Sequence, residues 1–304
     1  MLSIILPSYH EEQNVKFIYD EILKALDNTK DLELIYVDDG STDNTFEEVK
    51  KLAEKDKRVR GIRFSRNFGQ QAANLAGMHE ARGDLIVMMD ADGQHPPSII
   101  PSMLKMMEEG YDVVNTRRIY SEHVGLFRKI FSRLFYKVIS FLSEVNIDNS
   151  QVDFRLVNRK ALDAFLQFQE HNRFNRGLFT WMGFRQTQIE FTADNRNAGK
   201  SNYNFRNLRA LAVDGITSFS IRPLKISLYM GLIVLILGII YAIYAIINYF
   251  TGVPNPGWTS LITTILILGG TQLLSLGIIG EYLGRIFYES KKRPLYFISD
   301  KVGV

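Results

Sequence analysis

The chain has 304 residues, of which 46% are hydrophobic, and a formal net charge of +3. This length and apolar content suffice for one large or two modest domains with a buried core. The small net charge does not favour a nucleic-acid partner. The absence of cysteine excludes disulfides, thiolate catalysis and cysteine-ligated zinc, and it fits a reducing compartment.

Short apolar runs in the first part of the chain predict strands, and helical patterns lie between them. The predicted strands are residues 3–6, 32–37, 60–64, 84–89 and 111–114. Apolar residues repeat at helical spacing between the first two strands, and further helices are predicted near 43–55, at 70–81 and at 98–109. Strands that alternate with helices predict an α/β fold with a mostly parallel, Rossmann-like sheet.

Polar residues follow three of these strands, at 7–12, 38–41 and 90–92. Because the carboxyl ends of parallel strands meet at one edge of a sheet, where α/β folds bind ligands, these residues predict a single site. Asp90 and Asp92 are suited to a hard divalent cation that shares its oxygen ligands with substrate phosphates. Alone, an Asp-x-Asp sequence followed by glycine is as typical of a turn. Three acidic strand ends on one edge favour a metal-nucleotide site.

The sequence lacks the motifs of several other nucleotide and metal sites. No Walker A sequence is present, which disfavours a P-loop kinase or ATPase, and no Gly-x-Gly-x-x-Gly follows the first strand, which disfavours NAD chemistry. Residues 90–101 do not fit an EF-hand loop, because the twelfth position is Pro101 instead of glutamate.

Two later segments combine apolar and basic residues at helical spacing. Residues 124–142 and 205–219 are predicted amphipathic helices with arginine or lysine beside the apolar positions. This pattern is typical of helices that lie on anionic lipid, although an ordinary surface helix packed on the sheet has the same pattern. Their position close to two strongly apolar runs favours the membrane surface.

The two apolar runs, 226–250 and 259–280, contain no charged residue. We predict membrane spans at about 226–250 and 259–281, because roughly 20 helical residues cross a bilayer. A buried hairpin in a soluble protein is the alternative, but two such runs in succession are rare in cores. Basic residues flank the pair outside and are absent from the loop between, so the N-terminal region and the C-terminus are both predicted to be cytoplasmic. Residues 1–6 lack the basic segment and cleavage site of a signal peptide.

Several motifs in fixed order resemble those of glycosyltransferase family 2. They are Pro7-Ser-Tyr-x-Glu11, Val37-Asp-Asp-Gly-Ser41, Phe64-Ser-Arg-Asn-Phe-Gly69, Asp90-Ala-Asp-x-Gln-His-Pro-Pro97, Val152-Asp-Phe-Arg-Leu156, Ala198-Gly-Lys-Ser-x-Tyr203, Ser218-Phe-Ser-x-x-Pro-Leu224 and Gly280-Glu-Tyr-Leu-Gly-Arg285. The chain most resembles the polyisoprenyl-phosphate glycosyltransferases, namely dolichol-phosphate mannose synthases and bacterial undecaprenyl-phosphate glucosyltransferases. Two positions depart from the family pattern: His10 stands where asparagine is usual, and Gly93 where a larger apolar residue is common. Neither departure removes a carboxylate.

The resemblance implies a Rossmann-like GT-A domain with a mostly parallel sheet, followed by interfacial amphipathic helices and a two-helix transmembrane hairpin. The corresponding ranges are 1–200 for the GT-A domain, 201–224 for juxtamembrane helices, 225–287 for the spans and 288–304 for a cytoplasmic tail. It places the protein in the cell (inner) membrane as a multi-pass protein with both termini cytoplasmic. Two spans offer little contact surface in the membrane, so a homo-oligomer is compatible with the sequence. A product used outside the cytoplasm would need a flippase partner.

The implied activity is transfer of one sugar from a nucleotide sugar to a polyisoprenyl phosphate, with Mg²⁺ or Mn²⁺. UDP-glucose and undecaprenyl phosphate are the expected substrates, because two C-terminal spans resemble the bacterial glucosyl branch. Mannose from GDP-mannose and aminoarabinose are the alternative sugars. In-line attack by the acceptor phosphate on the anomeric carbon would invert its configuration.

The resemblance also assigns roles to individual residues. Catalytic roles fall to Asp92 and Asp153, metal binding to Asp90, Asp92 and Gln94, donor binding to Pro7, Tyr9, Glu11, Asp38, Asp39, Arg66, Asn67, Asp90 and Lys200, and acceptor-phosphate binding to Arg117, Arg128, Ser132 and Arg155. Asp153 matches an acidic residue often proposed as the catalytic base. However, a phosphomonoester has a second pKa of about 6 and needs little deprotonation at neutral pH. We therefore predict that Asp153 orients the acceptor, or supports the metal and Arg155, as much as it takes a proton.

Two other functions are weighed against this one. A processive polysaccharide synthase of the same fold would show Gln-x-x-Arg-Trp and more spans, and Trp181 and Trp258 lie in neither context. A non-catalytic module that binds sugar nucleotides would not need the carboxylates at 90, 92 and 153, which are all present.

Overall fold

The computed structural model describes residues 1–27, 31–119, 151–171, 173, 175–192, 220–251 and 257–303. Its first part alternates strands and helices: β1 (Leu2–Ser8), α1 (Asn14–Ala25), β2 (Leu32–Asp38), α2 (Thr45–Lys55), β3 (Val59–Phe64), α3 (Gln70–Glu80), β4 (Leu85–Met88), a 3-10 turn at Pro97–Ile99, α4 (Ile100–Glu108) and β5 (Val113–Ile119). The remaining described elements are β6 (Gln151–Asn158), α6 (Arg159–Leu166), α7 (Asn175–Trp181), β7 (Gln186–Thr192), α9 (Arg222–Phe250), α10 (Trp258–Ser290) and β8 (Ile298–Val302).

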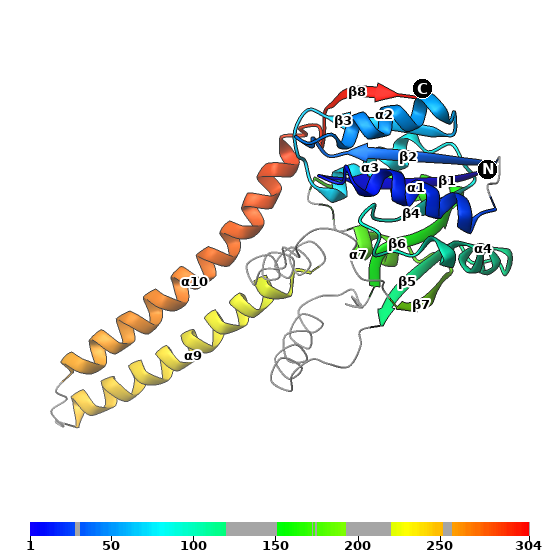
Figure 1. Cartoon of the computed structure of the whole chain (residues 1–304). Coiled ribbons are helices and arrows are strands. Elements are labelled where there is room, and N and C mark those ends of the chain that lie inside the picture. Colours follow the sequence, from blue (N-terminus) through cyan, green and yellow to red (C-terminus); the bar gives the residue numbers. More distant parts are fainter. Residues whose placement is uncertain are drawn as a thin grey trace.

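The strands form one eight-stranded sheet in the order β7-β5-β6-β4-β1-β2-β3-β8 (Figure 1). Strands β4, β1, β2 and β3 run parallel, so their carboxyl ends lie on one edge. Strand β6 is antiparallel to both β4 and β5, and β8 is antiparallel to β3. The predicted α/β fold with a mostly parallel, Rossmann-like sheet is confirmed.

Helices cover both faces of the sheet, which explains why its central strands are apolar on both sides. On β1, Ile4 and Leu6 pack in the cluster that contains the apolar residues of α1, α2 and α4. Ile5 points to the opposite face and packs in the cluster formed with α3, α6 and α7. The period-2 alternation of a strand therefore supplies both layers of the core from one uninterrupted apolar run.

The first four strands and the predicted helices between the first two strands, near 43–55, at 70–81 and at 98–109 are found close to their expected bounds. Strand β5 runs on to Ile119, beyond its expected end at 114, and β6, β7 and β8 were not predicted as strands. The predicted tail at 288–304 contains Ile298–Val302, which the structure places in the sheet. Strand β8 pairs with β3 from Gly61 opposite Val302 to Phe64 opposite Ile298. The end of the chain is thus an edge strand of the N-terminal domain.

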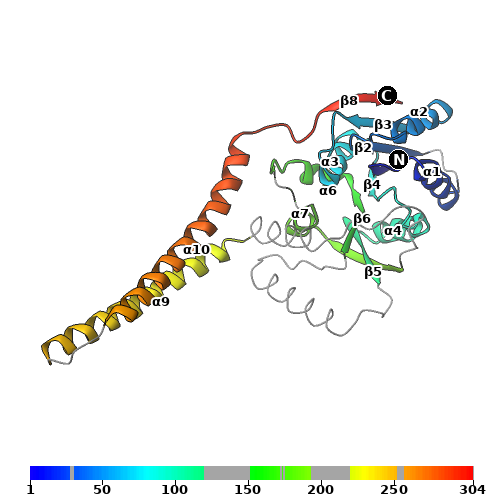
Figure 2. The same ribbon diagram turned by 60° about the vertical axis from the view of Figure 1, so that its left-hand side comes forward.

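Helices α9 and α10 lie side by side and project away from the sheet (Figures 1 and 2). Residues Arg222–Asn248 and Ser260–Ser290 are long and apolar enough to cross a membrane, with mean hydropathies of 2.7 and 1.9. Many of their large apolar side chains are exposed, among them Leu228, Leu266 and Leu273. Exposed apolar surface of this extent is typical of a surface that meets lipid or another protein. The predicted amphipathic segments at 124–142 and 205–219 lie outside the described residues.

Candidate functional site

A cavity of about 250 Å³ opens at the carboxyl ends of β1, β2 and β4. It is lined by Pro7, Ser8, Tyr9, Glu11, Asp39, Asn67, Gly69, Gln70, Ala73, Asp90, Ala91 and Asp92. The polar ends of β1, β2 and β4 therefore meet at one place, as expected from a parallel sheet.

Asp90 and Asp92 form the acidic wall of this cavity, directly after β4. Asp90 Oδ1 accepts a hydrogen bond from Gln70 Nε2 at 2.5 Å, and Asp92 Oδ1 accepts one from the backbone N–H of Gln94 at 3.0 Å. Burial raises the pKa of Asp90, and the negative charges of Asp153 and Asp92 raise it further. Two adjacent carboxylates held in a partly dry site favour a cationic ligand, which would relieve their repulsion.

His95 fixes the loop that carries the two aspartates. The backbone N–H of Asp90 donates to His95 Nδ1 at 2.9 Å, so Nδ1 is the unprotonated nitrogen of the ring. The ring is buried and stacks on Phe154 of β6, with centroids 5.2 Å apart. His95 is therefore a structural residue of the Asp-Ala-Asp-Gly-Gln-His-Pro-Pro motif.

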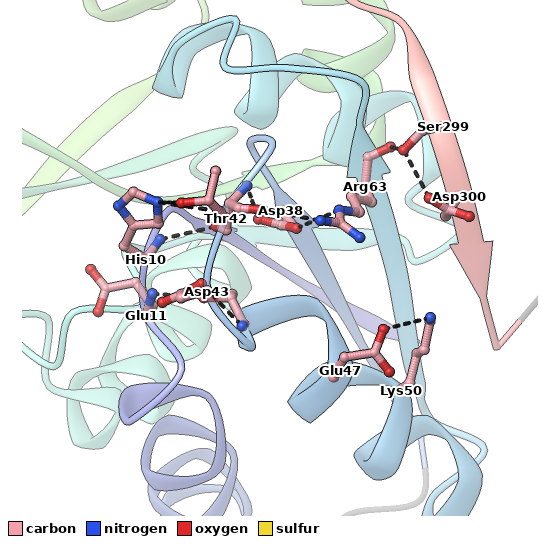
Figure 3. A network of polar contacts seen from close by, with 12 residues as sticks. His10, Glu11, Asp38, Thr42, Asp43, Glu47, Lys50, Arg63, Ser299 and Asp300 are labelled. Atoms are coloured by element: carbon pink, nitrogen blue, oxygen red, sulfur yellow. Dashed lines mark hydrogen bonds and ion pairs between the residues drawn. The ribbon is translucent and has the colours of Figure 1, made fainter.

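Side-chain contacts join the ends of β1 and β2 (Figure 3). The backbone N–H of His10 donates to Ser41 Oγ at 3.0 Å, and that of Glu11 donates to Thr45 Oγ1 at 2.9 Å. His10 has a φ of 58°, in the left-handed region where asparagine and histidine are both enriched. This conformation explains how histidine replaces the usual asparagine here. Tyr9 stacks on His10, with centroids 4.1 Å apart, and leaves an exposed aromatic face at the cavity.

Asp38 and Asp39 accept hydrogen bonds from backbone N–H groups of the loops beside them. Asp38 Oδ1 accepts from the backbone N–H of Ser41 at 3.0 Å, and its Oδ2 lies 3.4 Å from Arg63 Nε. Asp39 accepts from two backbone N–H groups of the next loop, those of Phe68 at 2.6 Å and Gly69 at 2.9 Å. Burial raises the pKa of both carboxyl groups, and these hydrogen bonds oppose the rise. Asp39 lines the cavity, whereas Asp38 lies buried beside it.

A second charged cluster is centred on Asp153 of β6. Arg176 of α7 forms a bidentate ion pair with it, because Nε donates to Oδ1 and Nη2 donates to Oδ2, each at 3.0 Å. Gln71 Nε2 donates to Oδ2 at 3.4 Å, and Arg155 Nη2 lies 3.6 Å from Oδ1. Burial alone would raise the pKa of Asp153, but the charges of Arg176 and Arg155 lower it to about 2.

Comparison with known proteins assigns the family. The model of glycosyl transferase family 2 matches residues 3–166, and that of the GtrB C-terminal hairpin matches residues 222–286. The chain belongs to glycosyltransferase family 2. It is 43% identical to the putative glycosyltransferase CsbB of Bacillus subtilis (strain 168), over 99% of this chain and 92% of that protein. It is 34% identical to the bactoprenol glucosyl transferase of Shigella phage SfV, over 99% of this chain and 98% of that protein.

Among solved structures, the fold resembles that of the mannosyltransferase PcManGT from Pyrobaculum calidifontis in complex with GDP-Man and Mn²⁺. The TM-score is 0.52 at 17% sequence identity, and the match covers 96% of this chain and 86% of that one. This similarity supports the GT-A fold alone. The family match confirms the predicted class of enzyme, a glycosyltransferase.

The side chains of this site that could bind a metal fit a divalent cation in part. Asp90 and Asp92 offer the hard oxygen ligands that Mg²⁺ and Mn²⁺ take, and such ions often use one or two carboxylates plus substrate phosphates. No group of three histidine, cysteine, aspartate or glutamate side chains within the described residues is arranged to hold a metal by itself. Gln94, the third predicted ligand, accepts from Arg118 Nη1 at 3.3 Å and would have to leave it to bind a metal.

Two of the predicted acceptor residues, Arg117 and Arg155, lie on the neighbouring strands β5 and β6. Arg155 is buried, stacks on Phe179 at 4.6 Å, and has Nη1 and Nη2 without a hydrogen-bond partner among the described residues. Burial lowers the pKa of Arg155 to about 10. Arg117 lies on β5 with Nη1 3.5 Å from Glu190 Oε1. Arg128, Ser132 and the predicted donor contact Lys200 lie outside the described residues.

The remaining predicted donor residue, Arg66, is not in the cavity lining. Its guanidinium lies over the Phe68 ring at 4.0 Å and donates to the backbone oxygen of Asn67 at 2.9 Å. Sequence reasoning missed Gln70, Gln71 and Arg176. The two glutamines directly follow the Phe64–Gly69 motif at the start of α3, and this position could have identified them. Nothing in the sequence around Arg176 pointed to Asp153.

Proposed function

We propose that this glycosyltransferase transfers a single sugar from a nucleotide donor to a polyisoprenyl phosphate at the cytoplasmic face of the cell membrane. UDP-glucose and undecaprenyl phosphate are the proposed pair. The observation that carries the proposal is a cavity with paired carboxylates in the same chain as two helices of membrane-spanning length. This combination suits a water-soluble phosphate donor and a lipid acceptor. Full-length similarity to proteins named bactoprenol glucosyl transferases supports it.

The cavity between the strand ends is the proposed donor site. Tyr9 presents an aromatic face on which a nucleobase can stack, and Asn67 and Gly69 line the wall between it and the aspartates. The donor diphosphate would lie toward Asp90 and Asp92. These two carboxylates would hold Mg²⁺ or Mn²⁺, which supplies Lewis-acid stabilisation of negative charge on a diphosphate leaving group.

The Asp153 cluster is proposed to orient the acceptor end of the reaction. With its pKa lowered to about 2 and Arg176 on both oxygens, Asp153 is ionised and poorly suited to accept a proton at neutral pH. The acceptor phosphate needs no base because its dianion is the main form above about pH 6. Its oxygen would bond to the anomeric carbon as the bond to the donor diphosphate breaks, with inversion at that carbon. Arg117, Arg128, Ser132 and Arg155 are the proposed contacts of the acceptor phosphate.

The helices α9 and α10 are the proposed membrane anchor, with the sheet and β8 in the cytoplasm. Arg222 and Lys225 stand at the start of α9, and Lys291, Lys292 and Arg293 follow α10. This distribution of basic residues supports the orientation. The anchor would keep the donor cavity close to the lipid whose phosphate is the acceptor.

Transfer by the full-length protein tests the proposal. Purified protein in vesicles that contain undecaprenyl phosphate would receive radiolabelled UDP-glucose, GDP-mannose or UDP-aminoarabinose, each with Mg²⁺ or Mn²⁺. We expect label from UDP-glucose in butanol-extractable lipid, strongly reduced in the Asp92→Asn variant, and a β-linked product from the α-linked donor by NMR. Preference for another sugar would overturn the choice of glucose. Donor binding without transfer from any sugar would indicate a binding module instead.

A further inference from the structure

The chain beyond α10 returns to the sheet and contacts the loop that lines the proposed donor cavity. We call residues 291–303 the C-terminal tail and residues 64–69 the donor loop. Helix α10 runs toward the edge of the sheet, and the tail continues from it into β8 beside β3 (Figures 1 and 2). The tail therefore connects a predicted membrane span directly to the catalytic domain.

Three contacts join the tail to the donor loop. The Tyr296 ring stacks on Phe64, with centroids 4.9 Å apart and an interplanar angle of 15°. The backbone N–H of Ser65 donates to the carbonyl oxygen of Phe297 at 3.0 Å. The Phe297 ring also lies 6.2 Å from that of Phe68. Contacts of this kind fix the loop at its beginning and near its end.

The opposite side of the donor loop rests on the turn after β2. Asp39 accepts from the backbone N–H groups of Phe68 and Gly69. Gly40 has a φ of 70°, and a Cβ there would overlap the backbone of Arg66. The loop is thus held between the Asp39–Gly40 turn and the tail, and its residues Asn67 and Gly69 line the cavity.

The base of the tail is itself fixed to the catalytic domain. Glu289, near the end of α10, accepts from the backbone N–H of His171 at 2.7 Å. Tyr288 lies beside the His171 ring, with centroids 6.2 Å apart. These contacts hold the end of α10 against the catalytic domain, close to the point where the tail begins.

We infer that Tyr296 and Phe297 are positioning residues of the donor site, which hold the donor loop against Asp39 so that Asn67 and Gly69 face the nucleotide sugar. The cavity on the catalytic domain is complete only when the tail that follows the second span lies on the loop. This inference rests on the proposed function in taking the cavity as the donor site.

Kinetics of tail variants in the full-length protein test the inference. We expect Tyr296→Ala to raise the donor KM about two- to tenfold, the range that loss of one aromatic pair produces, and to leave the acceptor KM unchanged. Tyr296→Phe keeps the stacked ring and should keep the donor KM. Phe297→Ala should raise the donor KM less, because its ring is largely exposed.

Lys301→Met is the matched control on the same strand. It removes the contact of Lys301 Nζ with Glu80 at the far side of β8 and leaves the donor loop untouched, so its donor KM should equal that of the wild type. Partial unfolding of any variant lowers the measured kcat by reducing the active fraction, but it does not change a KM.

An unchanged donor KM in Tyr296→Ala, with transfer still measurable, would overturn the inference. So would an equal rise of the donor KM in Lys301→Met, since the effect would then come from the sheet edge in general. Failure of the proposed function is distinct from both, because the wild-type protein itself would then transfer no sugar.

Discussion

Arg176 and Asp153 form a bidentate ion pair, with both guanidinium-to-carboxylate distances at 3.0 Å. The pair joins α7 to β6 and lies next to the acidic wall of the cavity, because the adjacent Gln70 and Gln71 donate to Asp90 and to Asp153 respectively. Both oxygens of Asp153 bind Arg176, so we expect Asp153 to act on a substrate mainly by fixing the position of Arg176.

Replacement of Arg176 tests this pair. Arg176→Ala should lower kcat about 10- to 100-fold, the usual cost of losing a residue that orients a functional group. Arg176→Lys keeps the charge but loses the bidentate geometry and should recover only part of the rate. Steady-state transfer assays check this. A full recovery by lysine would contradict the importance of the paired hydrogen bonds.

The role of Asp153 can be separated from that of a base by its pH dependence. Asp153→Asn should lose activity about 10- to 100-fold by the same reasoning, with a similar loss at every pH between about 6.5 and 9 because the acceptor is already ionised there. A pH–rate profile of kcat checks this. Recovery of the full rate at high pH would instead mean that Asp153 removes a proton.

The low pKa of Asp153 also predicts a stability effect. Because the folded-state pKa of about 2 lies below the ordinary value of 3.8, ionised Asp153 stabilises the folded state. This contribution is complete above about pH 4 and is lost as the pH falls toward 2. Thermal unfolding of wild type and Asp153→Asn should therefore show a Tm difference that is constant from pH 7 to about 5 and shrinks in stronger acid. A difference that shrinks already near pH 6 would contradict the lowered pKa.

Removal of the divalent metal should stop transfer. Replacement of a carboxylate of the acidic wall should lower the rate of transfer. We expect EDTA to abolish activity and Mn²⁺ or Mg²⁺ to restore it. Asp92→Asn should lower kcat by about 10²–10³, as expected when stabilisation of developing charge is removed. Gln94→Ala should lose much less, because Gln94 contacts Arg118 in the structure. A metal-independent rate in EDTA would contradict the metal site.

His10 offers a test of backbone strain. His10→Asn should keep stability and donor KM, since both side chains tolerate the left-handed conformation that His10 adopts. His10→Val should lower the free energy of unfolding by about 1–2 kcal/mol, because a β-branched residue resists a positive φ. Chemical unfolding and donor kinetics check both variants, and equal stability of the two would contradict the strain argument.

The sequence was sufficient to predict the first five strands and the position of the cavity. Their apolar runs are bounded by polar residues, and parallel strands bring those polar ends together, so Tyr9, Asp39 and Asp90 could be expected at one site. Along β6, Asp153 and Arg155 alternate with Phe154 and Leu156, a pattern that indicates a strand with one exposed face. The structure instead buries all four side chains, which the pattern does not show. The partner of Asp153, Arg176, lies 23 residues further along, and local pattern carries no signal of such a pairing.

Other features depend on contacts that no short motif encodes. Strand β8 has the polar, exposed sequence Ile-Ser-Asp-Lys-Val and forms only because β3 offers an unpaired edge. Likewise, Asp39 could be predicted as a site residue but not as the acceptor of the Phe68 and Gly69 N–H groups. Both require the position of a distant segment in space.

The place of β8 at the end of the chain has a consequence for biosynthesis. A ribosome completes β1 to β7 long before residues 298–302, and both α9 and α10 are made in between. Until then β3 remains an open sheet edge, the kind of surface that pairs with other chains. Closure of that edge therefore comes after both apolar helices have emerged, so the sheet is completed only once α9 and α10 have been made.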